Sequence, residues 1–118
     1  MKYLCLVYQD EAAIDAMSDA DYDAIVRDVL EYREELRQSG HYITSAPLKS
    51  VRTATTIRVR NGQTIMTDGP FAETKEQLGG FYLIEASDLN DALRVAAKMP
   101  PACMGSLEVR ALKEFTPK

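Results

Sequence analysis

Histidine, tryptophan and cysteine are scarce in this chain of 118 residues, which has one histidine, no tryptophan and two cysteines. The cysteines, Cys5 and Cys103, are far apart in the sequence, and neither is part of a Cys-x-x-Cys motif. One chain therefore lacks the ligands of a structural zinc site and the paired thiols of a redox motif. We expect Cys5 to be a small buried side chain and Cys103 a thiol in a loop, with no cofactor. We also expect no metal, because no ligand spacing argues for one, although Asp68, Glu73 and Glu76 are oxygen ligands that leave this alternative open.

Long apolar runs and an excess of positive charge are also missing. The longest apolar run is Tyr3–Tyr8, far short of the roughly 20 residues that a membrane-spanning helix needs, and no signal-peptide cleavage pattern follows it. The 14 basic and 18 acidic residues give a net charge of −4, and the basic residues are dispersed. We therefore expect no membrane anchor and no nucleic-acid partner, and a protein of the cytoplasm.

The remaining composition is that of an ordinary globular protein, with 46% hydrophobic residues. A chain of this length buries about two thirds of the surface that its unfolded form exposes, which is enough for one modest core. No repeat or low-complexity segment interrupts it. We expect a single domain over residues 1–118.

Hydrophobic periodicity predicts strands alternating with helices. One helix begins at a cap in Ser18–Asp21 and ends at Gly40, and a second begins at a cap in Ser87–Asp91 and ends before Pro100. The apolar residues expected to face a sheet are Tyr22, Ile25, Val26, Val29, Tyr32 and Leu36 in the first helix, and Leu89, Leu93, Ala96 and Ala97 in the second. The predicted extended segments are Tyr3–Tyr8, His41–Leu48, Thr53–Arg60, Gln63–Thr67, Phe81–Glu85 and Ser106–Leu112.

The dipeptide Asn61-Gly62 predicts a β-hairpin, because a type I′ turn needs positive φ at both of its central positions. Counting outward from the turn puts Ile57, Val59 and Met66 on one side of the hairpin and Arg58, Arg60 and Ile65 on the other. Arg58 then points the same way as Thr56, near the corner that Asp68 occupies. The alternative is an exposed charge on an edge strand.

The order strand, helix, hairpin, strand, helix, strand predicts an α+β fold of the ferredoxin-like βαββαβ type, with the first hairpin strand added at the sheet edge. Tyr3–Tyr8 and Phe81–Glu85 are apolar on both faces, yet two helices cover only one face of a sheet. Several hundred Å² of apolar surface would remain in water, which marks an interaction surface. A symmetric homodimer with the two sheets face to face would cover it.

Residues 68–76 (Asp-Gly-Pro-Phe-Ala-Glu-Thr-Lys-Glu) and 78–82 (Leu-Gly-Gly-Phe-Tyr) resemble the signature of the DGPF-domain proteins in the YCII-related superfamily. The similarity extends to residues 58–62, to Asp91-Ala92 and the alanines of the second helix, and to residues 105–110, so it covers essentially the whole chain. One departure is Ala111, which stands where the family usually has proline. The resemblance implies a dimeric ferredoxin-like α/β barrel and a gene often placed beside an extracytoplasmic-function sigma factor, which is a candidate partner. Related YCII members have been proposed to be enzymes because of a histidine and an aspartate in a cleft.

Asp68 is the best candidate for a catalytic base, because the rigid Asp-Gly-Pro corner would hold its carboxylate in place. His41 is the one histidine available as its acid–base partner. Nothing in the sequence brings His41 to the Asp68 corner, and His41 is also well placed to cap the last carbonyl groups of the preceding helix. Asp68 itself has a purely structural alternative, in which its carboxylate locks the turn.

The candidate ligand-binding residues are Tyr8, Arg58, Asp68, Glu73 and Lys75. Their charged members fall in or near the signature, and Tyr8 ends the first strand, where its hydroxyl reaches the same cleft. The alternatives are a solvated loop for Glu73 and Lys75 and a core position for Tyr8. Two functions stay open: a module that binds a small molecule in the dimer cleft, and an enzyme of the isomerase, lyase or hydrolase type with Asp68 as base.

Overall fold

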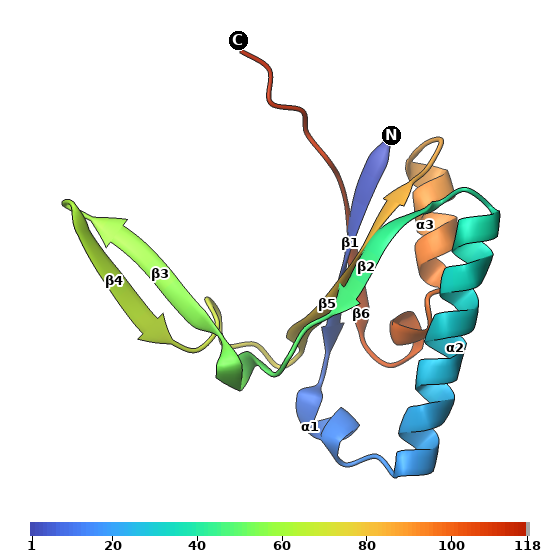
Figure 1. The fold of residues 1–118 in the computed structure, drawn as a ribbon, viewed down its shortest axis with the longest axis horizontal. Helices are drawn as coiled ribbons and strands as arrows, with labels where there is room; N and C mark the ends of the chain where they lie inside the picture. Colours follow the sequence, from blue (N-terminus) through green and yellow to red (C-terminus); the bar gives the residue numbers. More distant parts are fainter. Residues whose placement is uncertain (118) are drawn as a thin grey trace.

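A computed structural model describes residues 1–117 of the chain, in which strands and helices alternate (Figure 1). The elements, in chain order, are β1 (Lys2–Gln9), α1 (Glu11–Asp15), α2 (Asp19–Gln38), β2 (Tyr42–Pro47), the 3₁₀ turn η1 (Val51–Thr53), β3 (Thr55–Arg60), β4 (Gln63–Asp68), β5 (Gln77–Glu85), α3 (Leu89–Ala97), the 3₁₀ turn η2 (Pro100–Cys103) and β6 (Ser106–Ala111).

Four strands form an antiparallel sheet in the order β2-β5-β1-β6. The helices α2 and α3 both lie against one face of this sheet (Figure 1). This arrangement confirms the predicted ferredoxin-like βαββαβ fold. The second core strand is β2, which follows α2 after a short connection, as is usual in compact domains.

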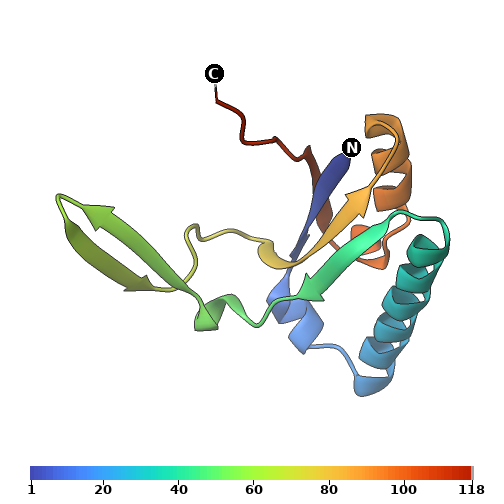
Figure 2. The same ribbon diagram turned by 45° about the horizontal axis from the view of Figure 1, so that its top comes forward.

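The hairpin of β3 and β4 forms a two-stranded sheet of its own. The prediction that it adds a strand to the sheet edge is therefore wrong, because β2 pairs with β5 along the edge where a hairpin strand was expected. The hairpin's internal register is as predicted, with Ile57 opposite Met66 and Arg58 opposite Ile65. We call this hairpin, Thr55–Asp68, the arm, since it projects away from the rest of the molecule (Figures 1 and 2).

The core lies between the helices and one face of the sheet. In β1, Tyr3, Cys5 and Val7 are 0–4% exposed and pack with Ile84 of β5 and Leu36 of α2. The predicted buried cysteine is thus confirmed, and Cys103 is exposed as expected. Alternation along β1 and β5 turns a second apolar set away from the helices.

The caps of both long helices agree with the sequence. Ser18 accepts the amide of Asp21 and Asp88 accepts the amide of Asp91, while Gly40 has a φ of +81° just after α2.

The faces that the helices bury differ from the prediction. Only Leu36 of α2 is fully buried, whereas Tyr22 is 50% exposed. In α3 the buried residues are Ala92, Val95 and Ala96, and Leu89 and Leu93 are about half exposed. Small side chains allow α3 to approach the sheet closely, and the N-terminal half of α2 stands away from it.

Candidate functional site

The sheet face opposite the helices is apolar and only partly covered. Its side chains are those at alternate positions of β1 and β5, and all are intermediate in exposure: Leu4, Leu6, Tyr8, Phe81 and Leu83. We call this set the open face. The arm and the C-terminal segment after β6 both leave the sheet on this side (Figures 1 and 2). The open face is therefore bordered by two projecting segments of the same chain.

The corner after the arm is fixed by backbone geometry at Gly69. Gly69 has a φ of +113°, its amide donates to the carbonyl of Ala54 at 2.8 Å, and its own carbonyl accepts the Thr56 hydroxyl at 2.9 Å. Within residues 1–117 the Asp68 carboxylate takes part in no hydrogen bond or ion pair. In this part of the chain the Asp68 carboxylate therefore makes none of the contacts that the alternative of a turn lock requires, and the side chain is available to a ligand.

Arg58 lies beside the signature loop (Gly69–Glu76) but on the other face of the arm from Asp68. Asp68 pairs with Thr55, so it shares a face with Ile57, whereas Arg58 shares a face with Thr56. The Arg58 guanidinium lies over the ring of Phe71, 5.7 Å from its centroid. The Phe71 ring is 81% exposed, so this cation–π pair presents a flat surface to solvent.

The second half of the signature loop is held by side chains that the sequence analysis did not assign to the site. The Gln77 amide group donates to the carbonyl of Thr74 at 3.0 Å, and its oxygen accepts the amide of Glu11 at 3.0 Å. Glu76 Oε1 accepts the hydroxyl of Ser106 at 2.7 Å. The loop is thereby tied to α1 and β6, and Glu73 and Lys75 remain exposed.

Tyr8 ends the open face beside this loop. It lies opposite Leu78 on β5 and opposite Ser106 on β6, and it is intermediate in exposure. The position before Ser106 needs a glycine, because a Cβ atom at Gly105 would lie 2.1 Å from the carbonyl oxygen of Tyr8. Strand register, which no local motif reveals, brings Tyr8, Ser106 and Glu76 together.

His41 lies at the other end of β2 from the arm, and its partner is Asp91. Its Nε2 is 3.0 Å from Asp91 Oδ2, and its Nδ1 is 2.7 Å from the Ser39 hydroxyl. The six residues of β2 separate His41 from the start of the arm connection, about 20 Å along an extended strand. The structure does not bring His41 and Asp68 together.

The Asp91 carboxylate makes three polar contacts, which join two parts of the chain. The amide of Ser87, His41 and the Arg94 guanidinium all contact it, and together they hold the pKa of the Asp91 carboxyl well below its usual range. Both ring nitrogens of His41 are engaged, which leaves none for a substrate. The cluster is a clamp between the α2–β2 connection and the start of α3, and the backbone of His41 also caps α2 by donating to Leu36.

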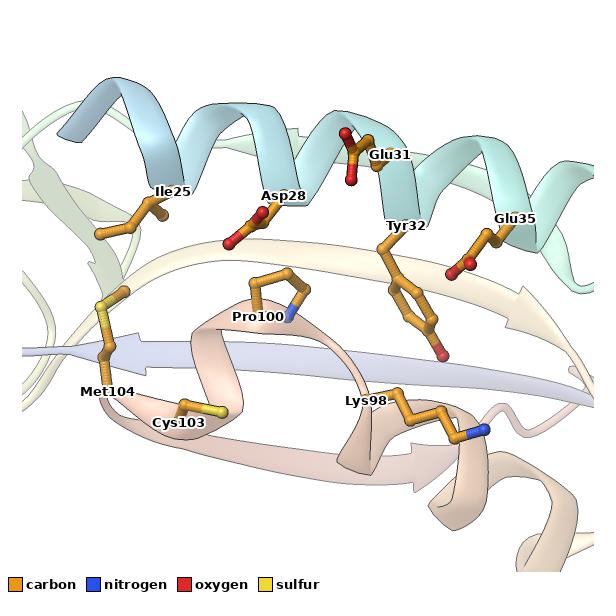
Figure 3. Close-up of a pocket in the computed structure, with 9 residues that line it drawn as sticks. All are labelled: Ile25, Asp28, Glu31, Tyr32, Glu35, Lys98, Pro100, Cys103 and Met104. Carbon is orange, nitrogen blue, oxygen red and sulfur yellow. The ribbon is translucent and has the colours of Figure 1, made fainter. Parts of the chain in front are cut away.

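Two cavities lie on the helix side of the sheet. The larger, about 540 Å³, lies between the N-terminal half of α2 and the sheet. The smaller, about 400 Å³, lies between α2 and η2, and Figure 3 shows its lining of Ile25, Asp28, Glu31, Tyr32, Glu35, Lys98, Pro100, Cys103 and Met104. Tyr32 crosses it to donate to the carbonyl of Val95 at 2.7 Å. Tyr8, Arg58, Asp68, Glu73 and Lys75 line neither cavity.

Residues 1–117 contain neither a membrane-spanning helix nor a cluster of metal-ligating side chains. No helix there is both long and apolar enough to span a bilayer. In the same part of the chain, histidine, cysteine, aspartate and glutamate side chains form no group of three or more that would hold a metal ion.

Comparison with known proteins decides the family. The family model of the YCII-related domain matches residues 1–116. The chain is a member of the YCII-related family. An uncharacterised protein of Rhizobium meliloti (strain 1021) is 40% identical to this YCII-related protein over 119 residues, which cover 99% of this chain and 96% of that one.

A solved structure shares the fold of this YCII-related protein. It is the 5-chloro-2-hydroxyhydroquinone dehydrochlorinase TftG from Burkholderia phenoliruptrix AC1100, in complex with 2,5-dihydroxybenzoquinone. The TM-score is 0.54 at 17% sequence identity, with 98% of this chain and 96% of that chain covered. At this identity the similarity supports the fold and not the reaction.

Proposed function

We propose that this protein binds a small molecule in a cleft between two copies of the chain, over the open face and beside the signature loop. One observation carries the proposal: a partly covered apolar floor adjoins the signature loop, where Glu73 and Lys75 are exposed, and Asp68, at the end of β4 just before this loop, is exposed as well. Ligand sites combine a mostly apolar lining with a few polar groups that set orientation. The open face supplies the first part, and the signature loop supplies the second.

A second copy supplies the wall that one chain lacks. Two sheets packed face to face lie about 10 Å apart, which leaves space for side chains and a flat ligand. Leu4, Leu6, Phe81 and Leu83 then form the floor on each side. An isologous dimer would give two equivalent clefts, one at each signature loop.

The side chains around the cleft favour a planar ligand with hydroxyl or carbonyl oxygens. Lys75 donates to an anionic or carbonyl oxygen, and the Arg58–Phe71 pair, on the other face of the arm from Asp68, offers a flat cationic and aromatic surface beside the loop. Asp68 accepts from a ligand hydroxyl. The ligand named with TftG, 2,5-dihydroxybenzoquinone, has this chemistry and serves as a probe.

The proposal is tested by titrating the protein with 2,5-dihydroxybenzoquinone, catechol and 2,5-dihydroxybenzoate in separate calorimetric experiments. We expect at least one probe to bind, and Lys75→Gln to weaken its binding about tenfold through loss of a charge-assisted hydrogen bond. Lys98→Gln is the matched control, because Lys98 lies on the helix side of the sheet, and it should bind as the wild type does.

The outcomes separate the two functions. Binding without chemical change supports the binding module, and conversion of a probe that stops in Asp68→Asn would favour the acid–base enzyme instead. No heat of binding with any probe at millimolar concentration, or equal affinities for Lys75→Gln and Lys98→Gln, would contradict the proposed site.

A further inference from the structure

The larger cavity on the helix side of the sheet has the size and the apolar lining of a ligand site. Its volume is about 540 Å³, within the range of about 300–1,000 Å³ that ligand pockets have. It lies where the N-terminal half of α2 stands away from the sheet, and Tyr22, Val26 and Leu30 of that half line it while remaining 36–50% exposed. We call it the helix-side cavity. Its α2 wall therefore offers apolar surface that the core does not use.

One charged side chain interrupts this apolar wall. Of α2, all of which the structure describes, only Arg33 contributes a charge to the lining. The residues three and four positions away are Val29, Leu30, Leu36 and Arg37, so neighbouring turns of the helix offer Arg33 no carboxylate. Within residues 1–117 the Arg33 guanidinium takes part in no ion pair, hydrogen bond or cation–π contact. A guanidinium beside an apolar wall favours an anionic partner.

Tyr82 of β5 brings a second unused polar group to the helix-side cavity. The residue is 5% exposed, and in the part of the chain that the structure describes its hydroxyl makes no hydrogen bond. Every fully buried side-chain nitrogen or oxygen there has a partner, so the Tyr82 hydroxyl still borders open space. Burial and the neighbouring Tyr42 raise the pKa of this hydroxyl, and the Arg33 guanidinium acts in the opposite direction, which indicates that Arg33 is close by.

The charged groups around the helix-side cavity are unevenly distributed. Glu11 and Asp15 belong to α1, at the end where α2 begins (Figure 1). Arg52 lies at the same end, because the Glu11 carboxylate accepts the hydroxyl of Ser50 and the amide of Val51 just before it. Charges of both signs therefore meet at the α1 end. The other end has the Arg33 charge alone among the lining residues, so an anion is favoured there.

The apolar part of the lining is elongated. Ile25 lies eight residues before Arg33, a distance of ~12 Å along a helix. Between them α2 contributes aliphatic side chains, and Val7, Pro101 and Met104 line the same cavity from other elements. An extended aliphatic chain with an anionic group at one end matches both this length and this distribution of charge.

We infer that the helix-side cavity binds an aliphatic monocarboxylate, with its carboxylate at Arg33 and Tyr82 and its chain along Ile25, Val26 and Val29. The site lies on the opposite side of the sheet from the proposed dimer cleft and needs no second copy of the chain. It is therefore a second ligand site, with its own ligand class, and it goes beyond the proposed function.

The test is calorimetric titration with octanoate, and with octylamine as a probe of the same chain length and opposite charge. We expect octanoate to bind and octylamine to bind at least tenfold more weakly. Arg33→Gln should weaken octanoate binding at least tenfold, through loss of a hydrogen bond between charged groups, and Tyr82→Phe should weaken it about fivefold. Arg27→Gln is the matched control, because Arg27 is exposed on the same helix and does not line the cavity. Circular dichroism should show the same fold in all variants.

Methyl NMR locates the bound octanoate without any substitution. The methyl signals of Val26 and Val29, which line the helix-side cavity, should shift on titration. Those of Leu4 and Leu6, on the open face, should stay unchanged.

Three results would overturn the inference: no binding of octanoate at millimolar concentration, equal affinities for octanoate in Arg33→Gln and Arg27→Gln, or shifts confined to Leu4 and Leu6. The proposed dimer cleft would survive the first two results, because its own test uses other probes and a substitution at Lys75. Failure of that test would in turn leave the helix-side site in place.

Discussion

At the scale of single residues, Asp91 joins three parts of the fold through one carboxylate. It accepts the amide of Ser87 before α3, contacts His41 after α2 and receives Arg94 from its own helix. Hydrogen bonds to the ionised form lower the pKa of a carboxyl group. Asp91 therefore contributes stability only while it is ionised.

This linkage predicts a pH dependence. Because the pKa of Asp91 is lower in the folded protein than its ordinary value of 3.8, its contribution is fully present above that value and is lost as the pH falls below it. We expect urea unfolding to show falling stability below about pH 4, and Asp91→Asn to be less stable at pH 7 and to flatten this acid limb. Asp23→Asn, on the exposed side of α2, is the control. An acid limb as steep in Asp91→Asn as in the wild type would contradict the clamp.

Asp68 and Gly69 are neighbours with opposite expected effects on stability. Asp68→Ala should change the free energy of unfolding by less than about 0.5 kcal/mol, because an exposed side chain without hydrogen bonds or ion pairs in the described chain contributes little to stability. Gly69→Ala should cost about 1 kcal/mol or more, because its φ of +113° is unfavourable for a residue with a Cβ atom. Denaturant unfolding measures both. A larger loss in Asp68→Ala than in Gly69→Ala would restore the interpretation of Asp68 as a turn lock.

Sequence reasoning succeeded at residues whose conformation is set locally. Asn61 and Gly62 have φ values of +52° and +75°, as the predicted turn requires, and the hairpin register follows from them. The freedom of Asp68 was not predictable in this way. It depends on two residues far from a local motif: the Ala54 carbonyl accepts the Gly69 amide, and the Thr56 hydroxyl donates to the Gly69 carbonyl, in place of bonds from the Asp68 carboxylate.

At the scale of elements, the ends of the helices were predictable and their buried faces were less so. Caps are local chemistry, and Ser18 and Asp88 act as expected. Which face a helix buries depends on how it packs against the sheet, and both α2 and α3 carry apolar residues on more than one side. As a result Tyr22 and Leu93, which were predicted to face the sheet, are 50% and 45% exposed.

The short helix α1 lies in a stretch for which the sequence predicted no helix or strand, and it positions the base of the arm. Glu11 Oε2 accepts the hydroxyl of Ser50 and Oε1 accepts the amide of Val51, both at 2.8 Å. These bonds fix η1, from which the arm begins after Ala54. Acidic residues around Asp10 gave no sequence signal for this contact, because its partner lies about forty residues away.

Removing this contact should loosen the base of the arm. Glu11→Ala should lower the local stability of η1 by about 1.5–3 kcal/mol, the contribution of a hydrogen bond to a charged group. Amide hydrogen exchange at Val51 should become correspondingly faster. Asp15→Ala, on the same helix, should leave it unchanged. Equal exchange at Val51 in Glu11→Ala and the wild type would show that the arm is positioned by other contacts.

At the scale of the whole molecule, the two-sided apolar character of β1 and β5 was the most informative pattern. It predicted the ferredoxin-like sheet and an apolar face without a helix layer, and both are present. It did not predict that the arm would stand apart from the sheet on the side of that face. The sequence shows which hairpin residues pair, whereas the direction of the hairpin depends on Gly69, η1 and Glu11 acting together.

The proposed cleft depends on a second copy of the chain, which would cover the open face and enclose the cleft beside Asp68 and Lys75. Sedimentation equilibrium of the wild-type protein at micromolar concentration tests this most directly. The proposed dimer should give a mass of about twice 13.2 kDa, independent of the rotor speed. A mass of 13.2 kDa over the whole concentration range would contradict it.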